Sequence, residues 1–301
     1  MNRVATAAVL IPIVLVLVLL APVLLLATVV AAVALITTRE VLQLAEHYGA
    51  RPMRTATYVY VVLVFAAVCL SVVWQTQVVD LGMSMTSLLA LSAAGAFVFL
   101  AVAMKRQDVA EAFPAAATSL LAVLYVAVPL ALLVVVRELW AGGFLVLYLL
   151  LVVWAGDTFA YYVGRAFGRR KLAPRVSPGK TWEGTAASFL GSIVVGSLVL
   201  QYGREISDAL LSVGLVARRY AYLTPQPAPL AESVFLTAAI NVAAQLGDLV
   251  ESLIKRGAGV KDSGALLPGH GGMLDRIDAL LFAVPVLWYY ATLRVLAQGH
   301  L

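Results

Sequence analysis

The residues best suited to chemistry lie in one short stretch near the end of the chain, at positions 252–278. The chain is 62% hydrophobic and only 12% charged, yet this stretch is crowded with charge. Together with the preceding Asp248, its ionisable residues are Lys255, Arg256, Lys261, Asp262, His270, Asp275, Arg276 and Asp278. A solvated loop between membrane helices needs basic residues for topology but has no use for acids beside them. The cluster therefore predicts a functional site.

Six glycines lie between positions 257 and 272 of this stretch. They disfavour a continuous helix, and they let backbone N–H groups approach a ligand with no Cβ in the way. A glycine-rich loop that also carries cations is suited to phosphate groups. We therefore expect a phosphate-binding loop at residues 257–277.

Carboxylates flank this loop on both sides. Asp248, Ser252 and Lys255 are spaced four and three residues apart, so they share one face of a helix. Asp275 and Asp278 are three residues apart in the first turn of the next helix, so they point the same way. Oxygen ligands at two helix ends around a phosphate-binding loop are typical of a Mg²⁺ site that carries substrate phosphates.

A second basic segment, residues 165–183, reads RAFGRRKLAPRVSPGKTWE and holds six of the 21 Lys and Arg residues. Such a cluster favours either general attraction to anionic lipids or a pocket for specific phosphates. The run from Ser177 to Thr181 favours the pocket, because hydroxyls, an exposed glycine backbone and Lys180 precede an expected helix N-terminus, with Glu183 just after it. The spacing is not that of a Walker loop, and no strand is expected ahead of it.

Asp157 lies within the apolar segment before this basic loop, about two helical turns from Arg165 at the cytoplasmic end. An acid at that depth is costly and by default indicates a functional site. The alternative is that Asp157 pairs with a lysine or arginine from a neighbouring loop.

Two further acids have simpler interpretations. Glu251 is one turn before Lys255 and can pair with it. Arg39 and Glu40 lie at the cytoplasmic end of the second helix, where a charged pair extending to the membrane interface is the expected role.

The composition is that of an integral membrane protein. The mean hydropathy is +0.97, and the charged fraction is about half of the roughly 25% that is usual in soluble domains. Apolar runs of about 20 residues predict helices, because barrel strands would alternate and be about 10 residues long. The net charge of +5 is explained by basic loops, so nucleic-acid binding is not expected. The single cysteine excludes an internal disulfide, and the three histidines are too scattered for a zinc site.

We expect an all-α polytopic membrane protein with about nine transmembrane helices. They are predicted at residues 4–20, 22–46, 56–75, 84–104, 115–136, 140–163, 183–202, 230–256 and 278–298. The N-terminus resembles a signal peptide, but apolar character resumes after Ala21 and Pro22, so cleavage is not expected. The first two runs form either a hairpin or one bent helix.

Nine crossings divide the Lys and Arg residues 16 to 5 between the two sides of the membrane. Because short cytoplasmic loops collect basic residues, the richer side is predicted to be the cytoplasm. The loops 164–182 and 257–277 then both face it, at the inner membrane of the cell. We expect residues 1–140 to form about five supporting helices and residues 141–301 to form the catalytic part. The loop 203–230 lies on the other side and has no functional interpretation.

The two charged segments resemble the signature of the phosphatidate cytidylyltransferase, or CDP-diacylglycerol synthase, family over roughly residues 154–280. In the C-terminal stretch the resemblance is carried by Ser252, Lys255, Arg256, Lys261, Asp262, Pro268, His270, Gly271, Gly272, Asp275, Arg276 and Asp278. In the earlier segment it is carried by Asp157, Tyr161, Gly164, Arg165, Ser177, Pro178, Lys180, Thr181 and Glu183. The N-terminal half adds only Arg3 and the run Leu10-Ile11-Pro12.

The resemblance implies transfer of CMP from CTP to phosphatidic acid, which gives CDP-diacylglycerol and pyrophosphate. It implies catalytic roles for Lys180, Asp248, Lys255, Arg256, Lys261 and Asp275. It implies substrate contacts from Ser177, Thr181, Glu183, Ser252, His270 and Arg276. It implies Mg²⁺ bound by Asp248, Asp275, Asp278 and Asp157. A second cation such as K⁺ and a homodimer are compatible with it.

Three alternatives stay open at this point. A CTP-dependent enzyme that acts on another lipid, such as an ether-lipid cytidylyltransferase or a polyprenol kinase, would share these features. An ion-coupled transporter is disfavoured, because its site would lie near the bilayer centre between repeats, whereas the ionisable residues here gather at one face. A non-catalytic scaffold leaves the paired acids unexplained.

Overall fold

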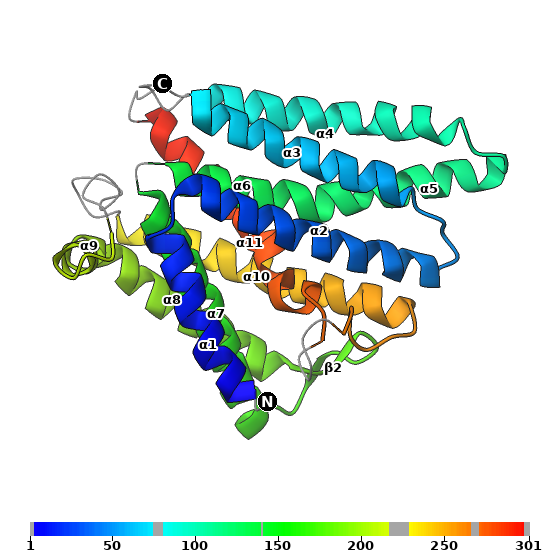
Figure 1. Ribbon diagram of the computed structural model, residues 1–301. Coiled ribbons are helices and arrows are strands. Elements are labelled where there is room, and N and C mark those ends of the chain that lie inside the picture. Colours follow the sequence, from blue (N-terminus) through cyan, green and yellow to red (C-terminus); the bar gives the residue numbers. More distant parts are fainter. Residues whose placement is uncertain (1–2, 75–80, 140, 217–228, 266–270, 298–301) are drawn as a thin grey trace. The chain divides into compact units, whose positions relative to one another are not determined.

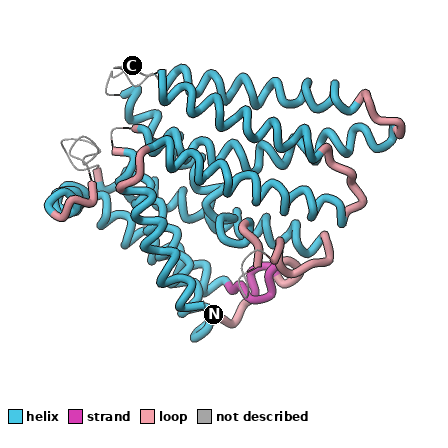
Figure 2. Tube along the Cα trace, viewed as in Figure 1, coloured by secondary structure: helices cyan, strands magenta, loops and turns pink. Residues whose placement is uncertain are grey.

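The computed structural model describes residues 3–74, 81–139, 141–216, 229–265 and 271–297, and these are almost entirely helical (Figures 1 and 2). The helices before the basic segment are α1 (Arg3–Leu19), α2 (Val23–His47), α3 (Arg54–Trp74), α4 (Leu81–Ala103), α5 (Val109–Ala122), α6 (Val128–Glu138) and α7 (Gly142–Phe167). Those after it are α8 (Trp182–Gln201), α9 (Gly203–Ser212), α10 (Leu230–Gly257) and α11 (Leu274–Ala297). The predicted helical membrane fold is confirmed.

Among the described residues, eight helical segments are long and apolar enough to cross a membrane. Eight of the nine predicted spans are therefore found at that length. The exception is α1, a shorter apolar helix of 17 residues. The first two apolar runs are two separate helices with a break at residues 20–22, where the sequence has Ala21 and Pro22.

The fifth predicted span, 115–136, is longer than expected and contains an irregular turn. It begins at Val109, because the Asp108 carboxylate accepts the Ala110 N–H at 2.9 Å and caps the helix. A π-helical turn, η1 (Val123–Ala127), joins α5 to α6 just before Pro129. Proline has no N–H to donate and its ring clashes with the carbonyl one turn earlier, so a wider turn at this point relieves the clash.

The basic segment contains a β-hairpin, and the expectation that no strand precedes the Ser177–Thr181 run is wrong. Strand β1 (Lys171–Ala173) pairs antiparallel with β2 (Ser177–Thr181), in the register Lys171 to Thr181 and Ala173 to Ser177. The Val176 N–H donates to the Ala173 carbonyl at 3.1 Å and closes the turn between them. Pro174 follows Ala173, at the turn position where the fixed φ of proline is favoured.

The loop predicted at 203–230 begins with the short helix α9. Ile206 and Leu210 are one helical turn apart and share a face of this helix. Residues 217–228 of the same loop lie outside the described part of the chain.

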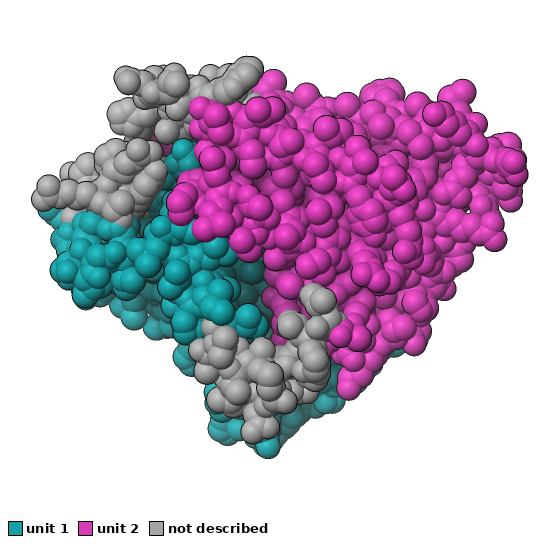
Figure 3. Space-filling model, in the orientation of Figure 1, with its two compact units in different colours: residues 1–21, 136–253, 278–291 teal, residues 22–135, 254–277, 292–301 magenta. Residues whose placement is uncertain are grey.

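The chain forms two compact units (Figure 3). Unit 1 consists of residues 1–21, 136–253 and 278–291. Unit 2 consists of residues 22–135, 254–277 and 292–301. Both α10 and α11 contribute to each unit, because the boundaries fall within these helices. The division predicted at residue 140 concerns function and stays a prediction.

In unit 2, α2 packs against α3, α3 against α4, and α4 against α5, as Figure 1 shows for the blue, cyan and green helices. The π-helical turn η1 contacts α2 and α3. This layer of helices supports α2, which carries Glu40.

In unit 1, α7 packs along α8 at very short range. A Cβ at Gly191 of α8 would collide with the Phe159 ring, and one at Gly196 would lie 2.8 Å from Val152 Cγ2. Glycine at these positions lets the two helices approach closely, as small residues commonly do in membranes.

A polar seam of four side chains links α8 and α10 inside unit 1. The Asn241 amide donates to Ser188 Oγ at 3.0 Å and to Ser192 Oγ at 2.8 Å. Gln245 Nε2 donates to Asn241 Oδ1 at 2.5 Å. Polar groups within a membrane protein interior are retained only when they are satisfied in this way. The seam therefore fixes the position of α10 seven residues before Asp248.

The substitution Gly156→Ala tests this packing. A Cβ at Gly156 of α7 would lie 2.7 Å from Asn241 Nδ2 and 2.8 Å from Ser192 Oγ. We expect a loss of about 1–3 kcal/mol, the usual cost of overpacking, seen as a lower thermal midpoint in detergent. Gly179→Ala is the control, because a Cβ there would meet nothing within 4 Å. Equal midpoints for the two variants would contradict tight packing at Gly156.

Candidate functional site

Three carboxylates come together in unit 1. One oxygen each of Asp248, Glu251 and Asp278 lies within 4.8 Å of the other two. Asp248 and Glu251 are nearly one turn apart on α10, and Asp278 is in the second turn of α11. Their short separation means that the three charges must be compensated.

Gly247 explains why the two helices bring these acids so close. A Cβ at this position would collide with the Asp278 carbonyl oxygen and would lie 3.2 Å from the Ala279 Cα. With glycine there, the backbone of α11 packs directly on α10 beside Asp248. The Ala279 N–H also donates to Asp278 Oδ1 at 2.8 Å, which helps to fix the carboxylate.

Lys180 and Asp157 complete this group. Lys180 Nζ on β2 forms an ion pair with Asp248 Oδ2 at 2.7 Å, and both side chains are partly accessible. Asp157 on α7 is within electrostatic range of Asp248, Asp278 and Lys180. The structure thus joins the basic hairpin to the C-terminal acids, as the sequence predicted for Lys180, Asp248, Asp278 and Asp157. We refer to Asp157, Asp248, Glu251 and Asp278 as the acidic cluster.

The donor set of the acidic cluster suits a hard divalent cation. All its potential ligands are carboxylate oxygens, which Mg²⁺ prefers over nitrogen or sulfur. Glu251 is only 1% exposed, and a buried carboxylate needs a compensating charge or hydrogen bonds. Within unit 1, the described residues therefore fit the predicted magnesium site.

The other predicted residues of the hairpin have local structural contacts. Thr181 Oγ1 accepts the Gly184 N–H at 3.2 Å and caps α8. The Glu183 carboxylate accepts the Arg169 and Arg170 N–H groups at 3.1 and 3.2 Å. Ser177 lies half-buried on β2, and Ser252 lies half-buried on α10. These contacts hold the hairpin that presents Lys180.

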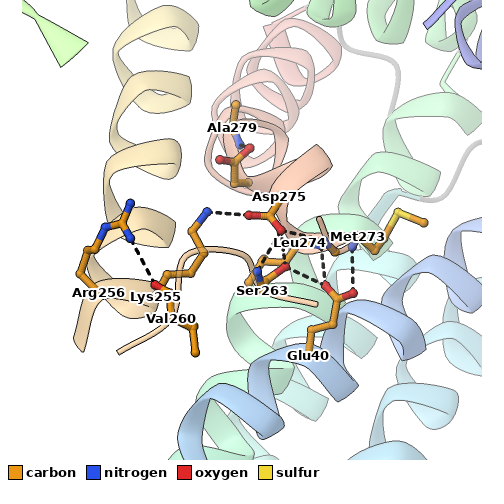
Figure 4. Close-up of polar contacts among 11 residues, drawn as sticks. Glu40, Lys255, Arg256, Val260, Ser263, Met273, Leu274, Asp275 and Ala279 are labelled. Carbon is orange, nitrogen blue, oxygen red and sulfur yellow. Dashed lines mark hydrogen bonds and ion pairs between the residues drawn. The ribbon is translucent and has the colours of Figure 1, made fainter. Parts of the chain in front are cut away.

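Asp275 is organised differently from Asp278, and its contacts lie in unit 2 (Figure 4). Its Oδ1 pairs with Lys255 Nζ at 2.5 Å. Its Oδ2 accepts the Ser263 N–H at 2.9 Å, the Ser263 hydroxyl at 2.8 Å and the Gly272 N–H at 2.7 Å. A carboxylate offers about four lone-pair sites, so these contacts occupy most of its capacity. Asp275 therefore orders the glycine-rich loop and orients Lys255.

The remaining predicted cations lie on the same loop and helix ends. Arg256, Lys261 and Arg276 are exposed, and Arg256 Nη1 donates to the Val260 carbonyl at 3.4 Å. His270 lies outside the described residues.

Two acids were not recognised as site residues from the sequence. Glu251 belongs to the acidic cluster, and its spacing of three residues from Asp248 was the available signal. Glu40 was assigned to an interfacial pair with Arg39, which is wrong because Glu40 is only 5% exposed. Its carboxylate binds groups more than 200 residues away in the sequence, so no local pattern could reveal its role.

Removal of one charge from the acidic cluster should weaken metal binding. Because Asp278→Asn replaces an anionic ligand by a neutral one, we expect Mn²⁺ to bind the purified protein at least about tenfold more weakly. Titration followed by electron paramagnetic resonance of free Mn²⁺ measures this. Asp108→Asn is the control, since asparagine also caps a helix. Equal Mn²⁺ affinity for wild type and Asp278→Asn would contradict a metal site here.

Comparison with known proteins agrees with the predicted family. A phosphatidate cytidylyltransferase from Haemophilus influenzae is 44% identical over 151 residues, which are 50% of this chain and 46% of that protein. One from Bacillus subtilis is 41% identical over 148 residues, which are 49% and 47% of the two chains. One from Thermotoga maritima is 39% identical over 183 residues, 60% of each chain. The matched part spans about half the length of these curated relatives, or somewhat more.

The family match extends well beyond these segments. Residues 1–294 match the Cytidylyltransferase family. This range covers the N-terminal helices as well as the hairpin and the acidic cluster. The family resemblance inferred from motif residues such as Lys180, Asp275 and Asp278 is thereby confirmed. The chain belongs to the cytidylyltransferase family.

Proposed function

We propose that this protein is a phosphatidate cytidylyltransferase, which transfers CMP from CTP to phosphatidic acid. The observation that carries the proposal is the contact between Lys180 of the hairpin and Asp248 of the acidic cluster. It joins a cation suited to phosphate to carboxylates suited to a divalent metal, in a chain that belongs to the cytidylyltransferase family. The names of its relatives supply the lipid substrate.

In the proposed reaction, a phosphate oxygen of phosphatidic acid attacks the α-phosphorus of CTP in line. The new P–O bond forms as the bond to the β-phosphate oxygen breaks, and pyrophosphate leaves. A phosphate monoester is already largely ionised at neutral pH, so no strong general base is needed. Catalysis then depends on positioning and on neutralisation of charge.

The acidic cluster would bind Mg²⁺ through Asp248, Glu251 and Asp278, with Asp157 close by. When bound, Mg²⁺ screens the repulsion between two anionic substrates and stabilises the leaving pyrophosphate. A second cation such as K⁺ belongs to the same proposal. Asp275 has its own hydrogen-bond donors, so we propose that it acts by orienting Lys255.

Lysine and arginine side chains would bind the phosphate groups. Lys180 is oriented by its pair with Asp248, and Lys255 by its pair with Asp275. Lysine suits this task because its ammonium is a compact charge with three donors. Further contacts to the substrates would come from Ser177, Thr181, Ser252, Arg256, Lys261, His270 and Arg276, and Glu183 would help to orient the lysines.

The exposed cations of the hairpin region fit an anionic lipid substrate. Arg169, Arg170, Lys171 and Arg175 are all exposed, in the segment that follows α7, the helix that carries Asp157, and that contains the hairpin with Lys180. Basic clusters beside transmembrane helices attract anionic headgroups at about 1 kcal/mol per charge. We propose that this region faces the cytoplasm at the inner membrane and gathers phosphatidic acid near the site. A homodimer and a supporting role for residues 1–140 are part of the same proposal.

The direct test is the release of pyrophosphate by the purified protein in mixed micelles. CTP, phosphatidic acid and Mg²⁺ together should give turnover, and omission of any one should abolish it. Replacing phosphatidic acid by an ether lipid or a polyprenol, and CTP by ATP, separates the proposed reaction from related ones. Higher turnover with another lipid acceptor would overturn the assignment of the substrate.

Lys180→Met should lower kcat/KM by about 100-fold or more, because it removes a charge that stabilises phosphate in the transition state. The measurement is the same pyrophosphate assay. Lys105→Met is the matched control, since Lys105 is exposed in the connection before α5. If Lys180→Met kept the activity of Lys105→Met, the proposed role of the hairpin would be wrong.

A further inference from the structure

Glu40 is a buried acid on α2, and it contacts segments far along the chain (Figure 4). Within unit 2, its Oε1 accepts the Met273 N–H at 2.9 Å, and its Oε2 accepts the Leu274 N–H at 2.8 Å. The Ser263 hydroxyl lies 3.1 Å from Oε2. A buried carboxylate is tolerated only with such partners, so the loop and the helix end are required to satisfy Glu40.

Two of these donors belong to the beginning of α11, which starts at Leu274. The first N–H groups of a helix have no partner within the helix, and the N-terminus carries a partial positive charge. A carboxylate at this position satisfies the N–H groups and the dipole together. Glu40 thus acts as a cap for α11 that is supplied by another helix.

Two glycines of the loop make room for Glu40. A Cβ at Gly264 would lie 2.7 Å from Glu40 Oε1, and one at Gly272 would lie 2.6 Å from both Glu40 oxygens. The sequence suggested that glycines here admit a ligand. At these two positions the close neighbours are instead groups of the same protein, the Glu40 carboxylate at both and also the Ser263 hydroxyl at Gly272.

The contacts of Glu40 continue to Lys255. The Ser263 hydroxyl lies between two carboxylates, 3.1 Å from Glu40 and 2.8 Å from Asp275. The Gly272 N–H binds Asp275, and the next two N–H groups bind Glu40. Asp275 in turn pairs with Lys255. Loss of Glu40 would therefore loosen Ser263 and the backbone at Gly272, which are the hydrogen-bond donors that hold Asp275 in place.

We propose that Glu40 is a positioning residue, which fixes the glycine-rich loop and the start of α11 so that Asp275 presents Lys255 to the phosphates of CTP. The proposal rests on the proposed function for its substrate. The claim that Glu40 orders the loop depends only on the contacts within unit 2. Two experiments test separately the ordering of the loop and its effect on CTP binding.

Limited proteolysis tests the hold on the loop without any substrate. Glu40→Gln removes the charge and turns one acceptor into an amide N–H₂ that faces backbone donors. We expect trypsin to cleave after the exposed Lys261 at least about fivefold faster in this variant, because local opening costs less. Glu46→Gln is the matched control, since Glu46 is on the same helix but pairs with Arg54 at 2.6 Å. Equal cleavage rates for Glu40→Gln and Glu46→Gln would overturn the proposal.

A double-mutant cycle on CTP affinity tests the link to Lys255. We expect Glu40→Gln to raise the Kd of CTP about fivefold to tenfold in the wild-type background, but less than about twofold when Lys255→Met is also present. A purely structural defect would raise the Kd equally in both backgrounds, and that result would overturn the positioning role. A wild-type protein that binds no CTP would refute the proposed function, and the proteolysis result would then decide the claim about Glu40.

Discussion

Repulsion among carboxylates is the constraint on which unit 1 depends. Oxygens of Asp248, Glu251 and Asp278 lie within 4.8 Å of one another. Two full charges at that separation repel by roughly 3 kcal/mol at an effective dielectric constant of about 20. Lys180 supplies one compensating charge through its pair with Asp248. A group of carboxylates with this excess of negative charge is suited to a divalent cation. The packing of the helices that carry the carboxylates opposes their repulsion.

That packing comes from small residues and from satisfied polar groups. Gly247 lets α11 lie against α10, and Asn241 fixes α10 to α8. Both constraints act on α10 just before Asp248, at Asn241 and at Gly247. The acids of unit 2 differ from the acidic cluster in how their charge is stabilised. Glu40 and Asp275 accept several N–H and hydroxyl hydrogen bonds each, so they order the loop.

Most of the helices could be predicted from the sequence, because a membrane span needs a long apolar run and few other patterns resemble one. The ends were less certain, since capping by Asp108 depends on a single side chain. The hairpin at 171–181 was missed because its strands are too short to show alternation, although Pro174 marked the turn. These errors concern short elements whose stability depends on tertiary contacts.

The site could be predicted in part. Lys180, Asp248 and Asp278 lie together as expected, and the signal for this was the presence of acids beside the basic residues that topology alone would explain. Asp275 and Asp278 were expected to act alike from their spacing, yet Asp275 turns back to Ser263 and Gly272. Glu40 could not be predicted, because helical periodicity contains no information on a partner more than 200 residues away.

The central claim is that the acidic cluster holds a divalent cation against the phosphates of CTP. Pulsed electron paramagnetic resonance of Mn²⁺ in the complex with CTP measures hyperfine coupling between the metal and the phosphorus nuclei. The account predicts this coupling in the wild-type protein and its loss when Asp248 and Asp278 are both replaced by asparagine. Unchanged coupling in that double variant would contradict the account.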